Sequence, residues 1–223
     1  MVTEKLNGSI PELDQKANEA KKRRALLELC SQLREKLQQR DLRELARKAA
    51  LSITTDPDGS LTLFGEQLLE TFRIKVPAYT VYDSKDQPAR LQSEMLWLHY
   101  LDRADGSPLT GRWVNLSEIG GLFYQQAFQG YCGDELAAAW GSDIEGLGQS
   151  CLDSGGWPLK RLADLAFEWR ILPRLPLCLC YRLPLENKAA WATILFDAAA
   201  NHYVAADVAA IVGKELTDRL KPS

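Results

Sequence analysis

The sequence predicts an α+β fold with an N-terminal helical arm, a small antiparallel or mixed sheet packed by helices, and a C-terminal amphipathic helix. Apolar spacing changes along the chain from helical to two-residue alternation and back, and strong turn signals separate the alternating segments. The resulting order of helices, strands, helices, strands and helix lacks the regular alternation of an α/β fold. The 223 residues, 46% of them hydrophobic, are enough to bury a core. We expect residues 1–40 to form the arm and residues 41–223 a single α+β domain.

The arm is charged and favours helix. It has an excess of basic residues, whereas the rest of the chain is acidic. One apolar stripe at three-and-four spacing consists of Leu26, Leu29, Cys30, Leu33 and Leu37. Asp41 is a helix-start signal for a second, shorter helix. The side chains that this helix turns inward are Leu42, Leu45 and Ala49. The stretch therefore predicts a helical hairpin or a kinked arm.

Strands follow the arm. The segment Asp56–Pro57–Asp58–Gly59 combines the residues that favour a tight turn, so we expect it to join Ile53 to Leu61 in a hairpin. Leu68, Phe72, Ile74 and Val76 then alternate with polar residues, which is typical of a strand with one buried face.

Helical spacing returns in the middle of the chain. A helix is predicted from the spacing of Leu91, Met95, Leu98 and Leu101, and shorter helices are predicted over 135–140 and 144–152. Gly111 to Val114 reads as a short extended piece, and Gly155 to Pro158 as a turn.

The last third of the chain reads as strands and a final helix. Phe167, Trp169 and Ile171 alternate with charged residues, and 192–196 is a further apolar run. Leu175 to Leu183 is apolar on both faces, so we expect a strand that is covered on both sides. The amphipathic helix that closes the chain is indicated by Val204, Val208, Ile211, Val212, Leu216 and Leu220.

Charge and composition exclude several classes of protein. A net charge of −3 argues against the broad basic surface of a non-specific nucleic-acid binder. No stretch resembles a membrane span, and the first ten residues lack the pattern of a secretory signal, so we expect a cytoplasmic protein with no nucleic-acid or membrane partner. The five cysteines are too scattered for a secreted disulfide framework or an iron–sulfur cluster.

Sequence motifs for common enzyme chemistry are absent. There is no phosphate-binding glycine loop, no nucleophile elbow and no zinc-protease motif, and only two histidines are available. His99 follows Trp97 on a helix and reads as a core-edge histidine or as a neutral imidazole offered to a metal or a proton. His202 reads as a loop residue or as a ligand. Cys178 and Cys180 should point the same way, as core residues or as donors to a soft metal, but we predict no metal site.

Tryptophan and arginine suggest a binding pocket. The chain has six tryptophans, which fill the core or line a flat apolar pocket. Arg112 beside Trp113 and Arg170 beside Trp169 are the candidate cations for an anionic ligand, because a guanidinium can bind a carboxylate with two parallel hydrogen bonds.

Several ordered segments resemble one protein family. They are Leu98-His99-Tyr100-Leu101, Pro108-Leu109-Thr110-Gly111-Arg112-Trp113-Val114, Leu172-Pro173-Arg174-Leu175-Pro176 and Ile194-Leu195-Phe196-Asp197. Together they are similar to the family known as domain of unknown function 3786, over roughly 45–221. The resemblance implies an uncharacterised protein of anaerobic bacteria or archaea, and some members carry a fused four-cysteine iron–sulfur module of the type seen in corrinoid proteins.

Three functions follow as hypotheses. The first is a non-enzymatic binding or accessory protein of anaerobic metabolism that handles a corrinoid, haem or another tetrapyrrole, or a partner that carries one. Its weak ligand candidates are His99, Tyr100, Arg112, Trp113 and His202, with either histidine as an axial ligand. The second is an enzyme in which His99, Arg112 and Tyr100 act on a small anionic substrate. The third is an assembly factor that grips a protein partner with its N-terminal helix. The oligomeric state stays open at this point.

Overall fold

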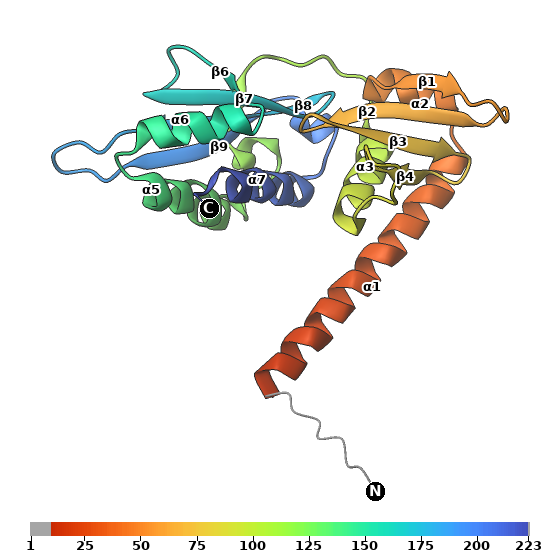
Figure 1. Cartoon of the computed structure of the whole chain (residues 1–223), viewed down its shortest axis with the longest axis horizontal. Coiled ribbons are helices and arrows are strands. Elements are labelled where there is room, and N and C mark those ends of the chain that lie inside the picture. The colour runs from red at the N-terminus through yellow and green to blue at the C-terminus, as the bar shows by residue number, and fades with distance from the viewer. Residues whose placement is uncertain (1–9, 223) are drawn as a thin grey trace, which may run out of the picture.

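Two antiparallel sheets lie side by side along the longest axis of the molecule (Figure 1). The computed structural model describes residues 10–222, with side chains from Asn18 onward. Helices pack against both sheets, and the first helix projects from the body. The α+β class is therefore confirmed. The strands, however, form two separate sheets where one small sheet was predicted, because the loop after the third helix carries the chain across to a second set of strands.

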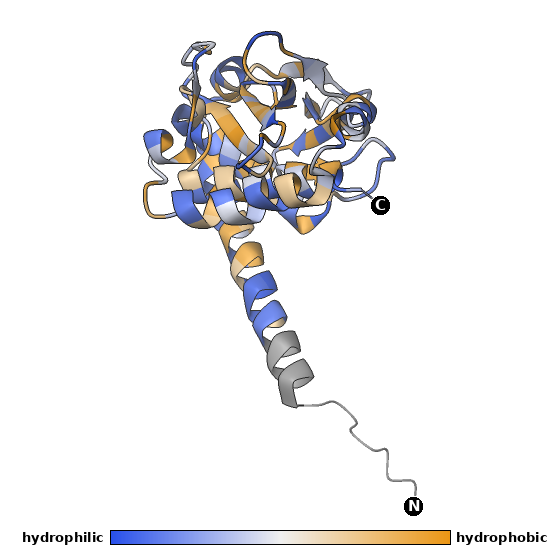
Figure 2. Ribbon diagram, turned by 90° about the vertical axis from the view of Figure 1, so that its left-hand side faces the viewer, coloured by the Kyte–Doolittle hydropathy of each residue, from blue (hydrophilic) through white to orange (hydrophobic). Residues whose placement is uncertain are grey.

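The N-terminal region is a long helix followed by a short one. Their bounds are α1, Ile10–Gln38, and α2, Leu42–Ala49. Cys30, Leu33 and Leu37 are buried against the body, whereas residues 18–25 of α1 are exposed and mainly hydrophilic (Figure 2). The Asp41 side chain accepts a hydrogen bond from the Glu44 backbone N–H at 2.7 Å, which confirms it as the N-cap of α2.

The first sheet is a four-stranded meander in which each strand pairs with the next. Its strands are β1, Ser52–Thr55; β2, Leu61–Gln67; β3, Glu70–Val76; and β4, Thr80–Tyr82. Ile53 pairs with Leu63 across the predicted Asp56–Gly59 turn. Phe72 and Ile74 are buried as the alternation requires, but Leu68 is not in the strand. Leu68 and Leu69 are the two central residues of the β2–β3 turn, so the strand begins at Glu70.

Helix α3, Leu91–Arg103, packs against the first sheet and against α1. Trp97 lies so close to β2 that a Cβ atom at Gly65 would overlap its ring. Ion pairs between Arg34 and Glu94 and between Lys36 and Asp102 join α1 to α3, the second at 2.7 Å. The base of the N-terminal helix is thus part of the folded body.

The chain between α3 and β7 is mostly helical and also supplies the two edge strands of the second sheet. Its elements are β5, Trp113–Val114; η1, Leu116–Ile119; α4, Gln125–Phe128; η2, Gln129–Asp134; α5, Glu135–Trp140; α6, Ile144–Asp153; and β6, Trp157–Pro158. The two short helices predicted over 135–140 and 144–152 are present. The predicted turn at Gly155 to Pro158 is wrong in its second half, because Trp157 and Pro158 pair with the neighbouring strand.

The second sheet has the strand order β5-β9-β8-β7-β6, all antiparallel. Its long strands are β7, Leu165–Leu172; β8, Leu175–Arg182; and β9, Trp191–Asp197. Every residue of β8 from Leu175 to Tyr181 is buried, which confirms a strand covered on both faces. Helices α5, α6 and α7 cover one face, and a smaller apolar cluster that includes Cys178 and Cys180 lies on the other.

The C-terminal helix α7, Ala206–Leu220, follows the short helix η3, Ala200–His202. Five of the six predicted apolar positions are buried, namely Val204, Val208, Val212, Leu216 and Leu220. Val204 precedes the helix, and Ile211 is 51% exposed although it was predicted to face the core. Among residues 10–222, no helix combines the length and the apolar composition needed to cross a bilayer.

Candidate functional site

Tyr100 lies on α3 and is fully buried. Its hydroxyl donates a hydrogen bond to the Ala49 carbonyl at 2.8 Å and accepts one from the Arg174 backbone N–H at 3.1 Å. Its ring stacks on Tyr203, with the ring centroids 5.7 Å apart. Burial raises the pKa of the phenol, so the group stays neutral. Tyr100 ties α2, α3 and the β7–β8 turn together.

His99 is half-buried on the same helix. Its Nδ1 atom is buried and has no hydrogen-bond partner among the described residues. Burial lowers the pKa of the imidazole, and the nearby Arg103 lowers it further, so the ring is neutral near pH 7. A neutral imidazole can accept a proton or bind a metal, but His99 does not line the cleft where the two sheets meet.

Arg112 and Trp113 point to different surroundings. The exposed Arg112 guanidinium forms an ion pair with Glu118 at 3.3 Å. Trp113 is half-buried and packs on the small cluster that contains Cys178 and Cys180. The two sulfur atoms are 3.9 Å apart, which confirms that they point the same way. No group of three or more metal-ligating side chains occurs in the part of the chain that the structure describes.

His202 is the last residue of η3 and is exposed. Its Nδ1 atom is 2.7 Å from Asp105 Oδ2 and 3.2 Å from Ser107 Oγ. The Ser107 backbone N–H and His202 together hold the pKa of Asp105 at about 2. Tyr100, Arg112, Trp113 and His202 are thus engaged in separate contacts and the Nδ1 atom of His99 has no partner among the described residues, and none of these five predicted residues lines the cleft described below.

A buried carboxylate holds the loop that precedes β5, and sequence reasoning gave it no role. Asp197, at the end of β9, is only 1% exposed. It accepts hydrogen bonds from the backbone N–H groups of Thr110, Gly111 and Ala199, at distances down to 2.7 Å, and from the Thr110 hydroxyl at 3.0 Å. Gly111 has φ +68°, a left-handed conformation that suits glycine. We call this set of hydrogen bonds the Asp197 clamp. Its only signal in the sequence was an aspartate at the end of an apolar strand.

The candidate binding site is a cleft of about 700 Å³ where the two sheets meet. This volume is in the range of small-molecule sites. One wall comes from β1, β2 and the β2–β3 turn, and the other from β6, β7 and the loop before β6. The lining residues that carry the argument are Glu66, Leu69, Trp157, Glu168, Trp169 and Arg170.

A strained turn forms one rim of the cleft. Leu68 and Leu69 have φ values of +47° and +69°, as a two-residue hairpin turn demands but a leucine rarely adopts. The side chain of Leu69 is 73% exposed and reaches the opposite wall, where a Cβ atom at Gly155 would overlap it. Unfavourable backbone geometry of this kind is concentrated at functional sites.

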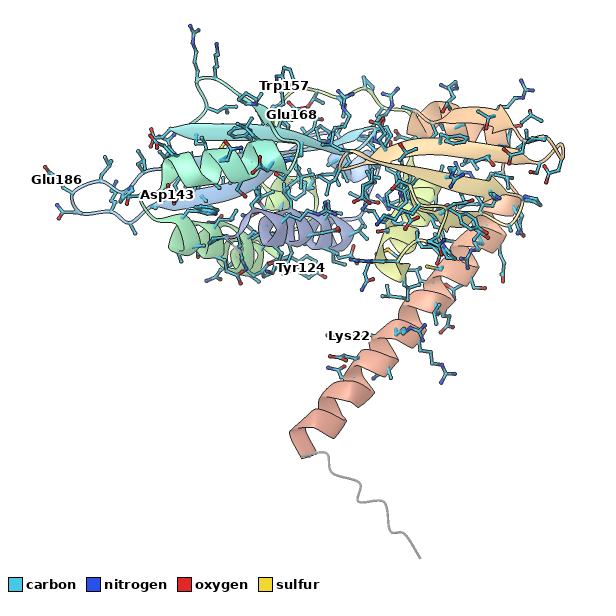
Figure 3. The ribbon with its side chains drawn as sticks, in the orientation of Figure 1. Lys22, Tyr124, Asp143, Trp157, Glu168 and Glu186 are labelled. Carbon is cyan, nitrogen blue, oxygen red and sulfur yellow. The ribbon has the colours of Figure 1, made fainter. Side chains whose placement is uncertain are left out.

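Two tryptophans form the other wall. Trp157 pairs with Glu168 across β6 and β7, and both side chains lie on the face of the sheet that the helices leave free (Figure 3). Trp157 is 74% exposed, whereas Trp169 is buried and its Nε1–H donates to Ser154 Oγ at 3.2 Å. The wall therefore offers one exposed aromatic face, that of Trp157, whereas Trp169 is packed closely against Gly156.

The cleft also contains charges without partners. Glu66, Glu168 and Arg170 form no ion pair within 4 Å among the side chains that the structure describes. Elsewhere charges are paired, as Arg73 is with Asp86 at 2.8 Å. The arrangement can thus accept N–H donors from a ligand at the two glutamates and bind a carboxylate at Arg170.

Comparisons with known proteins give one match. The family model described as "Domain of unknown function (DUF3786)" matches residues 41–219, from the N-cap of α2 to the last turn of α7. No curated protein and no solved structure matches. Since the matched segment covers most of the chain, the resemblance noted from the sequence is confirmed. The chain belongs to the DUF3786 family, a domain of unknown function.

Proposed function

We propose that this protein is a non-enzymatic binding protein that holds a flat, carboxylate-bearing small molecule in the cleft between the sheets. The observation that carries the proposal is the exposed face of Trp157 beside the unpaired Arg170. An indole face binds a flat apolar ring, and a guanidinium binds a carboxylate on the ring's edge. Glu66 and Glu168 accept N–H groups from the same ligand.

Tetrapyrroles and corrinoids are the ligand class that the family resemblance favours, because some family members carry a fused module of the type seen in corrinoid proteins. In this proposal the protein has a cytoplasmic accessory role in anaerobic metabolism. The exposed indole of Trp157 and the guanidinium of Arg170 support this ligand class, because they offer an aromatic face to the ring and a cation to its carboxylates. The cleft does not fit axial coordination by histidine, because His99 lies on α3 outside the cleft and His202 is paired with Asp105. The proposed binding mode therefore uses the ring face and its side groups alone, with the cleft residues supplying stacking and charge.

An enzyme built on His99, Arg112 and Tyr100 has less support. The Tyr100 hydroxyl already makes two hydrogen bonds, and Arg112 pairs with Glu118. That hypothesis requires the three side chains to converge on one cleft. Instead, Tyr100 and Arg112 contact different groups.

An assembly role for the N-terminal helix rests on one observation. Residues 18–25 of α1 are exposed and include a basic run at 21–24 (Figure 2). Removing residues 1–24 should leave the buried Cys30, Leu33 and Leu37 in place, so the shortened protein should fold. Loss of a partner from this folded variant, detected by pull-down, would support the assembly role, and an unchanged set of partners would contradict it.

The binding proposal is tested by titration of the full chain with protoporphyrin IX, haem and cobalamin, followed by absorbance and tryptophan fluorescence. We expect a saturable spectral change with protoporphyrin IX and with haem, whose propionates supply the carboxylates, and similar affinities for the two because no axial ligand is involved. Cobalamin, whose ring side groups are amides, should bind more weakly. Replacing His99 or His202 by alanine should leave binding unchanged.

Matched variants locate the site. Arg170→Gln should weaken binding about tenfold, the size expected for the loss of one hydrogen bond to a charged group. Arg182→Gln, an exposed arginine on the next strand, should not. Trp157→Leu should likewise weaken binding, and Trp191→Leu should not. Absence of binding to all three probes, or equal loss in the cleft variants and their controls, would overturn the proposal.

A further inference from the structure

Leu69, the second residue of the β2–β3 turn, has a conformation that the stability of the fold does not explain. With Leu68 it forms a two-residue turn in which both φ values are positive, where asparagine and glycine are the usual residues. A residue with a Cβ atom loses free energy in this conformation. Leu68 is compensated by burial, since only 7% of it is exposed. Leu69 is 73% exposed, so the core gives it no such compensation.

The side chain of Leu69 spans the cleft between the two sheets. The β2–β3 turn lies at the end of the first sheet that faces the second sheet (Figure 1). On the opposite wall, a Cβ atom at Gly155 would overlap the tip of Leu69, so the leucine rests directly on backbone. Gly155 has no side chain against which Leu69 could bury more surface. Leu69 therefore bridges the two walls without being buried by either.

This bridge limits the thickness of a ligand in the cleft. Leu69 lines the cleft from the first sheet, and Trp157 lines it from the second. A flat ring can contact both, because an aliphatic side chain and an indole face are each apolar surfaces. A group that projects from the face of the ring needs the space that Leu69 occupies, so it must push the turn away from Gly155.

We propose that Leu69 is the specificity-determining residue of the cleft, and that it selects a flat ring carboxylate whose two faces carry no firmly bound ligand. This inference rests on the proposed function and narrows its ligand class. The unfavourable backbone conformation is retained because leucine makes an apolar contact with the ring that the better turn residue, glycine, cannot make. Strain of this kind persists at ligand clamps.

Titration of the full chain with protoporphyrin IX and with dicyanohaem, both in the same cyanide buffer, tests the selection. The two rings have the same carboxylates, but dicyanohaem carries a cyanide on each face of its iron. We expect the natural chain to prefer protoporphyrin IX by about tenfold or more. Leu69→Gly should weaken protoporphyrin IX binding about tenfold, as expected for the loss of one apolar contact, and leave dicyanohaem binding unchanged. Leu69→Met supplies an apolar side chain of similar length and should keep the preference.

Thermal unfolding without ligand separates a binding role from a structural one. Leu69→Gly should raise the melting temperature by about 2–4 °C, because glycine adopts positive φ without strain. Leu185→Gly is the matched control, since Leu185 is 72% exposed in the β8–β9 hairpin, lies outside the cleft and is not among the described residues with positive φ. Glycine at that position should lower the melting temperature, because it gains only unfolded-state freedom.

The outcomes distinguish this inference from the proposed function. If the natural chain binds neither ring, the proposed function is overturned and the inference with it. If the rings bind but Leu69→Gly keeps the natural ratio of the two affinities, the inference alone is overturned. A lower melting temperature in Leu69→Gly would also overturn it, because Leu69 would then serve the stability of the turn.

Discussion

The Asp197 clamp makes a strong prediction about stability. In Asp197→Ala, four donors lose their acceptor, namely the N–H groups of Thr110, Gly111 and Ala199 and the Thr110 hydroxyl. Leaving a buried donor unsatisfied costs about 1–3 kcal/mol. Thr110 and Gly111 are exposed, so water can replace their bonds, whereas Ala199 is buried. We therefore expect the free energy of unfolding to fall by about 3 kcal/mol, less than the four bonds would sum to.

Urea unfolding at 25 °C, followed by tryptophan fluorescence and by circular dichroism, measures this loss. Asp164→Ala is the control, because exposed Asp164 accepts one bond, from the Leu183 N–H at 2.9 Å, and its removal should cost less than about 1 kcal/mol. Asp197→Asn keeps one acceptor oxygen, so its loss of unfolding free energy should lie between those of Asp197→Ala and Asp164→Ala. An Asp197→Ala protein that is as stable as the control variant would refute the reasoning that the clamp holds the loop before β5.

Three further predictions concern the other buried polar groups. Tyr100→Phe removes both hydrogen bonds of the hydroxyl and should lower the free energy of unfolding by about 2 kcal/mol without affecting ligand binding, as urea unfolding and the ring titration would show. Burial lowers the pKa of His99, so the folded state binds fewer protons than the unfolded state just below pH 6.5. Stability should therefore decrease as the pH falls from 7 to 5, and His99→Gln should flatten this slope in unfolding curves. All five cysteines are buried, and burial raises the pKa of Cys30 and Cys132 to about 11 and of Cys151 to about 12. A thiol reagent at pH 8 should therefore titrate them only after denaturant is added, and rapid reaction of the native protein would contradict this burial.

Much of the secondary structure follows from local signals in the sequence. The Asp41 N-cap, the Asp56–Gly59 turn and the doubly buried strand at Leu175 were all predicted, because each depends on residues close together in the chain. The β2–β3 turn was not, since two leucines with positive φ contradict the usual turn residues. The pairing of Trp157 with β7 was missed for a similar reason, because two residues are too few to show a strand pattern.

The candidate site was only partly accessible from sequence. Arg170 beside Trp169 was singled out as a cation next to an aromatic ring, and both line the cleft. The opposite wall, with Glu66 and Leu69, comes from a segment about a hundred residues earlier, and local patterns contain no information on which strands of two separate sheets meet. Ile211 shows the same limit. The helical spacing correctly predicted the apolar residues of α7, but it did not show that Ile211 would remain 51% exposed in the fold.

Indole N–H resonances test the central claim most directly. The six tryptophans give six such signals in a protein labelled with nitrogen-15, and single substitutions assign them. On addition of a saturating flat carboxylate ligand such as protoporphyrin IX, the account predicts that the Trp157 and Trp169 signals shift, while those of Trp113 and Trp191 stay in place. Shifts confined to Trp113 or Trp191, or no shift in any signal, would contradict binding in the cleft between the sheets.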